Sequence, residues 1–199
     1  MTGKRKRIKQ YRAWCDQTRV AAYDDARMLA LAIAGSCHLP AISTYDLGIV
    51  LGVGEVVWQR TPAAYWWRGE QRWTEQRTSH AGYRSTFTEV RRESMNCAGT
   101  LGWLITSQRL VAREPTGEVI SIHWTAIQAV SVDLIADAVA LDGAAGYHCE
   151  LRGPAIAPVG VAAIACCFGP RALLDHPSLV ALRGVRVPVP TALDRESIE

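Results

Sequence analysis

Apolar and polar residues alternate most regularly in the second half of the chain. In the segment YHCELR (147–152), each apolar residue is followed by a polar one. A period of two places one side of a strand in a core and the other side in water. On similar grounds, strands are predicted in EVISIHW (118–124), IQAVSVDL (127–134) and DAVALD (137–142). Consecutive strands joined by short turns predict an antiparallel sheet that is bent or closed.

The stretch LGWLITSQRLVAR (101–113) predicts two further strands, because its polar residues lie only at a central break and at its edges. A turn is predicted at 114–117, where Pro115 and Gly117 favour turn backbone angles. Residues 47–73 are rich in Val, Trp and Tyr, which is a strand composition. Residues 69–98 are polar and weakly periodic, and predict only one or two short strands within long loops.

Helical patterns flank these strands. Ala, Leu and Met predict a helix over 18–36. The segment 154–168 is apolar on every side and uncharged, but it contains Pro and Gly and is shorter than a typical membrane span of about 20 residues. A buried helix is predicted there, with a membrane segment and a strand as the alternatives. A short helix is predicted within 171–183, and a loose tail from 186 onward.

Charge divides the chain into a basic front and a mildly acidic back. Residues 1–92 carry 15 Lys/Arg against 8 Asp/Glu, whereas residues 93–199 carry 7 against 11. No apolar segment follows the basic start, so no secretory signal is expected and the chain is predicted to be cytoplasmic. The six cysteines form no zinc-type spacing and are expected to be reduced thiols.

The order of several short motifs resembles the bacterial pleckstrin-homology-like (PH-like) and GRAM-like domains over about 46–168. The matching residues are Leu51, Gly54, Glu55, Val57, Gly102, Leu104, Thr106, Arg109, Leu110, Trp124 and Ile127, followed by the helix after Gly153. The resemblance implies a seven-stranded bent sheet that forms a partly open barrel, with one end plugged by the final helix. This chain departs from the family pattern in its long 69–98 segment, its less amphipathic last helix and its added N-terminal helix.

The expected fold class is therefore α+β, mainly β: a PH-like, partly open antiparallel barrel closed by a C-terminal helix, with an N-terminal helix added. Three parts are expected. Residues 1–45 form a basic arm and helix, residues 46–170 form the barrel with its closing helix, and residues 171–199 form a short helix and tail.

No catalytic constellation is visible. The five histidines are scattered, and the glycines at 48, 52 and 54 form no phosphate-binding loop. Cys166 and Cys167 lie in an apolar helix and are expected to be inert, and Arg109 is expected to bond loop carbonyls. Neither a metal site nor a cofactor is predicted, and the chain is not expected to be an enzyme. An enzyme with an unrecognised site is the minor alternative.

Two groups of residues are candidates for binding. The basic arm offers Lys4, Arg5, Lys6, Arg7, Lys9 and Arg12, with Tyr11 and Trp14 at its end. It is either a disordered solubilising segment or a contact for phosphates of lipid or nucleic acid. The second group is a belt of arginines and aromatic residues: Arg60, Tyr65, Trp66, Trp67, Arg68, Arg72 and Trp73. Some of its tryptophans are expected in the core and others on a binding rim.

The leading functional expectation is a non-enzymatic interaction module that binds a protein or peptide, with weak membrane association through the arm. The alternative is an anionic-surface binder, for phospholipid or nucleic acid, that uses the arm and the Arg/Trp belt. No small-molecule cofactor is expected in either case, and peripheral membrane localisation accompanies the cytoplasmic prediction.

Overall fold

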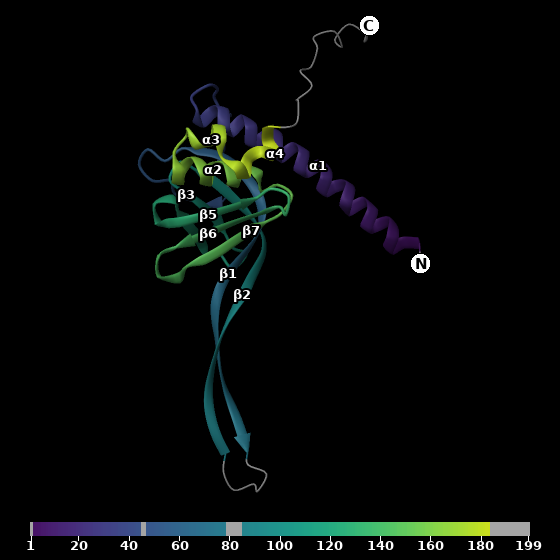
Figure 1. The fold of residues 1–199 in the computed structure, drawn as a ribbon, viewed down its shortest axis with the longest axis vertical. Helices are drawn as coiled ribbons and strands as arrows, with labels where there is room; N and C mark the ends of the chain where they lie inside the picture. The colour runs from purple at the N-terminus through teal and green to yellow at the C-terminus, as the bar shows by residue number, and fades with distance from the viewer. Residues whose placement is uncertain (1, 45–46, 79–84, 184–199) are drawn as a thin grey trace.

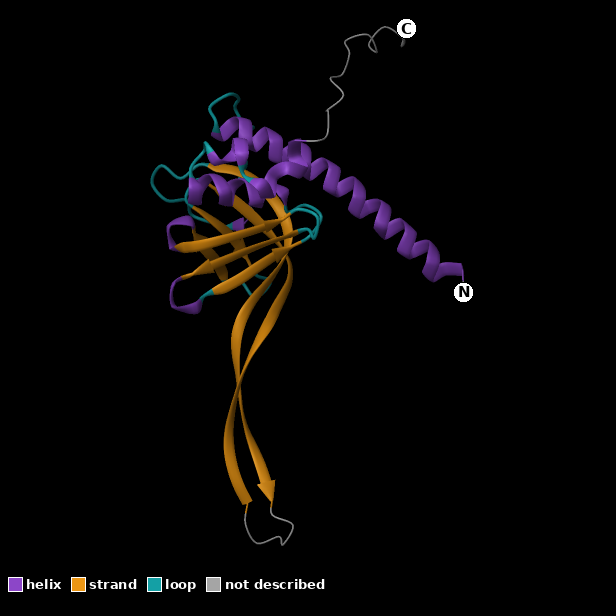
Figure 2. Cartoon of the chain, in the orientation of Figure 1, coloured by secondary structure: helices purple, strands orange, loops and turns teal. Residues whose placement is uncertain are grey.

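The computed structural model describes residues 2–44, 47–78 and 85–183, with the side chains of 2–3 and 70–92 outside the description. Figures 1 and 2 show the arrangement of its helices and strands, which bury one main core cluster and a small second one at Ile49, Leu104 and Val111. They are α1 (Thr2–Ile33), β1 (Val57–Thr78), β2 (Ser85–Thr106), β3 (Arg109–Arg113), β4 (Val119–His123), β5 (Ile127–Asp133), β6 (Ala138–Gly143), β7 (His148–Arg152), α2 (Ala157–Phe168), α3 (Ala172–Asp175) and α4 (Val180–Arg183).

The strands form a seven-stranded antiparallel sheet in the order β4-β3-β2-β1-β7-β6-β5. β1 joins the two halves of the sheet because it pairs with β2 along one edge and, over Ala64–Trp67, with β7 along the other. The sheet curls into a half-barrel with helices at its ends (Figure 2). The expected fold class, α+β and mainly β, is confirmed.

The strand alternation predicted for the second half of the chain is confirmed. In β7, Cys149 and Leu151 are buried while Arg152 is exposed, and in β4 Ile122 is buried between exposed neighbours. The largest fully buried side chain of the sheet is Trp103, which belongs to the main core cluster. Burying an aliphatic or aromatic side chain of this kind contributes about 1.5–3 kcal/mol.

The helix α2 lies between the curled sheet and α1, which explains its uniform apolar character. Nine of its twelve residues are buried, and its side chains share one core cluster with Leu29 of α1 and Leu141 of β6. A helix that is apolar all round requires burial on every side. The predicted buried helix is therefore confirmed. Among the helices described, none is long and apolar enough to cross a membrane.

The helix α1 begins at Thr2, much earlier than the predicted start at 18. The interpretation of the basic arm as a disordered segment is therefore wrong. Lys, Arg and Gln have good helix propensity, and no glycine or proline interrupts the chain between Lys4 and Ile33. The helix ends near Gly35, as predicted, where a positive φ of 76° suits glycine.

Residues 69–78 and 85–98 belong to two long strands, and not to short strands within long loops as predicted. The strands β1 and β2 are 22 residues each, and they pair from Val57 with Thr106 to Thr78 with Ser85, with register shifts at Val57/Gln59 and Tyr65/Trp66. Beyond Trp67, β1 pairs with β2 alone, so the two strands leave the half-barrel as a long two-stranded arm (Figure 1). No neighbouring strand imposes a buried side on this arm, which explains its weak periodicity.

Candidate functional site

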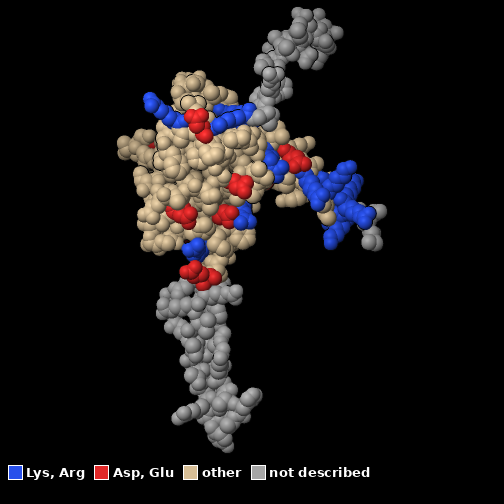
Figure 3. All heavy atoms as spheres, viewed as in Figure 1, with Lys and Arg blue, Asp and Glu red and all other residues tan. Residues whose placement is uncertain are grey.

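The first half of α1 carries a dense group of cations on a helix that leaves the body of the protein. Figure 3 shows the Lys and Arg side chains gathered there. We call residues 4–14 the basic segment. Its six cations, all exposed, are Lys4, Arg5, Lys6, Arg7, Lys9 and Arg12. None of the six forms an ion pair with a residue that the structure describes, and the first acidic residue of the chain is Asp16.

Apolar side chains also lie exposed on the basic segment. Ile8, Tyr11 and Trp14 are 45%, 63% and 51% exposed, and the rings of Tyr11 and Trp14 lie 5.7 Å apart. Three-residue spacing places neighbouring members of this set on adjacent positions of the helix surface. Ile8 and Tyr11 continue the helical face that Ala22 and Leu29 bury in the core. The basic segment therefore presents a partly exposed apolar stripe among its cations.

Two contacts fix α1 to the half-barrel just after this segment. Arg19 donates hydrogen bonds from Nε and Nη2 to both carboxylate oxygens of Asp137, at 2.8 and 2.6 Å. The Tyr23 hydroxyl donates to the carbonyl oxygen of Leu134 at 3.1 Å. Both acceptors lie at the turn between β5 and β6, so the basic segment begins where the body of the protein ends.

A cleft of about 320 Å³ lies where α1, β1 and β7 meet. Tyr11 and Trp14 line it from the helix, Trp66 lines it from β1, and Arg152 lines it at the end of β7. The structure thus brings the basic arm and one member of the Arg/Trp belt to a common site. The sequence analysis did not predict this proximity. Continuing the helical spacing of the core-facing positions back from Ala22 through Thr18 would have placed Tyr11 on the core-facing side of α1, but it would not have placed Trp66 beside it.

The remaining belt residues are distributed between the core and the surface. Tyr65 and Trp67 stack on one another with ring centroids 5.2 Å apart, and both contact the core. Arg60 is exposed. Arg68 is also exposed, with its Nε 4.0 Å from a carboxylate oxygen of Glu93. The structure therefore does not gather these residues into one rim.

The last two belt residues, Arg72 and Trp73, belong to the two-stranded arm. Their backbones pair with Arg91 and Val90 of β2. Their side chains lie outside the described part of the chain, so the prediction that they belong to a binding rim stays a prediction.

Glu55 and Arg109, which carried the family resemblance, form a buried structural network. The Nε of Arg109 donates to Glu55 Oε1 at 2.9 Å, and its Nη2 donates to the carbonyl of Val50 at 2.8 Å. Thr106 Oγ1 and the backbone N–H of Gly52 also donate to the carboxylate, each at 2.6 Å. Burial would raise the pKa of Glu55, but these donors and the guanidinium lower it to about 2. Arg109 holds the loop before β1, as predicted.

Cys166 and Cys167 lie partly buried in α2, and His148 lies in β7. Burial raises the pKa of Cys166 to about 12, with the neighbouring Cys167 adding to the effect, and it also raises the pKa of Cys167. His148 Nδ1 lies 2.6 Å from Asp142 Oδ1 on the wet side of β6 and β7. Across the described ranges, no three His, Cys, Asp or Glu side chains are placed to hold a metal ion.

No protein-family model matches this chain, and no curated protein has a significantly similar sequence. The basic segment and the cleft beside it are therefore assigned from their geometry alone.

Proposed function

We propose that this chain is a non-enzymatic PH-like binding module that docks on an anionic phospholipid surface through the basic segment of α1. The observation that carries the proposal is the set of six exposed cations that have no acidic partner among the described residues, on a helix that projects from the body. The seven-stranded order and the helix at the end of the sheet are consistent with the PH-like resemblance, which implies an interaction role.

The electrostatics of the segment favour an anionic surface. Each Lys or Arg near such a membrane contributes about 1 kcal/mol, so that six would give several kcal/mol of attraction. Salt screens this attraction over a Debye length of about 10 Å at 0.1 M. Binding should therefore weaken steeply as the salt concentration rises.

The exposed apolar stripe favours a membrane over a nucleic acid. Trp14 and Tyr11 belong to the residue types that are enriched at membrane interfaces, and Ile8 is an aliphatic side chain that a bilayer buries. Aromatic side chains also stack on unpaired bases, but Ile8 would gain nothing comparable there. Vesicle and oligonucleotide binding distinguish a phospholipid surface from nucleic acid as the ligand of the basic segment.

The cleft supports a second candidate, an acidic peptide. It joins three aromatic side chains, Tyr11, Trp14 and Trp66, to the guanidinium of Arg152. Aromatic residues and arginine are enriched at the centres of protein interfaces. A peptide bound there would contact the cations of the basic segment and would not require a lipid.

Vesicle flotation tests the main proposal. The full chain should float with phosphatidylcholine vesicles that contain phosphatidylserine and should stay behind with phosphatidylcholine alone. The variant K4Q/R5Q should partition about 30-fold more weakly, because two cations contribute about 2 kcal/mol. The control R171Q/R183Q removes the same charge from exposed positions at the opposite end of the chain and should float like the wild type.

Two results would overturn the proposal. One is equal flotation of K4Q/R5Q and R171Q/R183Q, which would show that vesicle binding depends on the net charge of the chain and not on the basic segment. The other is tight, salt-sensitive binding of a single-stranded oligonucleotide without vesicle binding, which would assign the basic segment to nucleic acid.

A further inference from the structure

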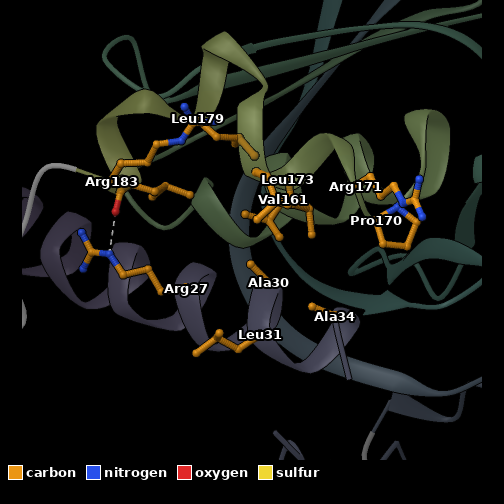
Figure 4. Close-up of a pocket in the computed structure, with 12 residues that line it drawn as sticks. Arg27, Ala30, Leu31, Ala34, Val161, Pro170, Arg171, Leu173, Leu179 and Arg183 are labelled. Carbon is orange, nitrogen blue, oxygen red and sulfur yellow. Dashed lines mark hydrogen bonds between the residues drawn. The ribbon is translucent and has the colours of Figure 1, made fainter. Parts of the chain in front are cut away.

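A second cavity, distinct from the basic segment, lies between the last turns of α1 and the helices α2, α3 and α4. It encloses about 570 Å³, within the range of about 300–1,000 Å³ that is usual for small-molecule sites. Figure 4 shows Ala30 and Leu31 of α1, with Ala34 just after its end, on one side, facing Val161 of α2 and Leu173 of α3. Nine of the twelve residues that line it are apolar, so its interior suits a hydrocarbon ligand.

The charged residues of the cavity all have one sign. They are Arg27, Arg171 and Arg183, and no lining residue is acidic. Arg27 and Arg183 lie at one end in Figure 4, and Arg171 lies at the other. The guanidinium groups of Arg171 and Arg183 form no ion pair within the described part of the chain. Such a lining complements a ligand that has an apolar body and an anionic head.

The end that holds Arg27 also favours a hydrogen-bond acceptor. The Nε of Arg27 donates to the carbonyl of Leu182 at 2.7 Å, and its Nη1 donates to Asp24 at 2.6 Å. Its Nη2 is buried and has no partner among the described residues. A buried donor without an acceptor is costly, and a carboxylate oxygen is a strong acceptor for a guanidinium N–H.

The cavity is built into the fold and is open to solvent at its rim. Leu179 and Leu182 are buried in its wall, and the bond from Arg27 to Leu182 ties α1 to α4. In contrast, Leu31 and Leu174 also line it but remain 48% and 72% exposed. Large exposed apolar side chains around a cavity are typical of a surface that binds a ligand.

From these observations we infer that the cavity binds a single-chain fatty acid, with the hydrocarbon between α1 and α2–α3 and the carboxylate at Arg27 and Arg183. The apolar lining supplies the burial, and the one-sided positive charge selects the carboxylate over a neutral head. This site is independent of the membrane-docking proposal, since it shares no residue with the basic segment.

The test uses dodecanoate as the probe, below its micelle concentration, with the full chain. Calorimetry should detect one dodecanoate per chain. Dodecanol should bind at least about tenfold more weakly, because its neutral hydroxyl cannot form the charge-assisted hydrogen bond that the carboxylate forms with arginine. In R171Q/R183Q, the ratio between the affinities for dodecanoate and dodecanol should be smaller than in the wild type. A34W should abolish binding by filling the cavity from an exposed position, whereas V20W adds the same ring to an exposed position of α1 outside the cavity and should bind normally.

Several outcomes would overturn the inference. Equal affinity for dodecanoate and dodecanol would show that the site does not recognise the carboxylate. Full binding of dodecanoate by A34W would show that this cavity is not the site. No binding of dodecanoate at all would rule out the fatty acid as the ligand. Sedimentation of the wild type and A34W would then test a second copy of the chain as the occupant, because A34W would dissociate such a dimer. Circular dichroism of A34W separates loss of binding from loss of fold.

Discussion

Arg19 and Asp137 form a bidentate ion pair, in which Nε and Nη2 of Arg19 lie 2.8 and 2.6 Å from Oδ1 and Oδ2 of Asp137. This pair joins the helix α1 to the β5–β6 turn, 118 residues further along the chain. It lies where α1 leaves the half-barrel, so it sets the direction in which the basic segment projects. Asp137 also has a φ of 53°, in the left-handed region, where Asn and Asp are tolerated.

Removing the charge of Asp137 should loosen the attachment of α1. D137N keeps a side chain that tolerates the left-handed backbone but weakens both hydrogen bonds, and should lower the free energy of unfolding by about 1–2 kcal/mol. D16N is the matched control, because it removes the exposed carboxylate that Arg19 contacts at 3.0 Å, and exposed pairs contribute less than about 1 kcal/mol. Urea denaturation measures both, and equal effects would contradict the anchoring role.

The buried carboxylate of Glu55 should make stability depend on acid pH. Its pKa is lowered from 4.5 to about 2 in the folded chain. The unfolded state therefore binds the proton more readily, and stability is lost as the pH falls from about 4.5 towards 2. The loss from this group amounts to about 3 kcal/mol. Urea denaturation between pH 7 and pH 2 measures it.

The variant E55Q separates this group from general acid denaturation. It should cost about 3 kcal/mol at pH 7 because it leaves Arg109 without its carboxylate, and it should flatten the acid dependence. E118Q, at an exposed position, should keep both the stability and the pH profile of the wild type. An unchanged profile in E55Q would rule out Glu55 as the source.

Gly160 of α2 packs against Val132 of β5 with no room for a side chain. A Cβ at this position would lie 2.8 Å from Cγ1 of Val132 in β5. Although alanine favours a helix by about 1 kcal/mol over glycine, overpacking against a stiff β-branched neighbour costs about 1–3 kcal/mol. G160A should therefore destabilise the protein in thermal denaturation. In G160A/V132A the two effects should be less than additive, and full additivity would show that the two residues do not interact.

Alkylation should distinguish the thiols by their environment. Burial raises the pKa of Cys149 to about 11 and, with Cys167 adding to the effect, that of Cys166 to about 12, so both should resist iodoacetamide near neutral pH. Cys97 is exposed and should react first. Peptide mass spectrometry measures the order, and early labelling of Cys166 would contradict the expectation that the Cys166–Cys167 pair is inert.

The half-barrel could be predicted from the sequence because burial imposes a pattern on it. Strands β4 to β7 alternate because one side meets the core, and α2 is apolar all round because it contacts both the sheet and α1. The two-stranded arm was missed for the opposite reason. Beyond Trp67 it pairs only with itself, so no core imposes a period of two on its residues.

The candidate site was predictable only in its parts. The cations of the basic segment are evident in the sequence, and their helix propensity is compatible with a helix without requiring one. Helix propensity alone is a weak signal for an exposed segment. The cleft could not be predicted, since Trp14 and Trp66 come together only through the packing of α1 against the β5–β6 turn.

Quenching of Trp14 fluorescence by lipid tests the central proposal most directly. Vesicles that contain phosphatidylserine and a phospholipid with bromine atoms in its acyl chains quench only tryptophans that enter the bilayer. The proposal predicts that these vesicles quench the wild type more strongly than W14F, and that the difference disappears with phosphatidylcholine alone. Equal quenching of wild type and W14F by bound vesicles would show that the membrane contact lies elsewhere and would contradict the proposal.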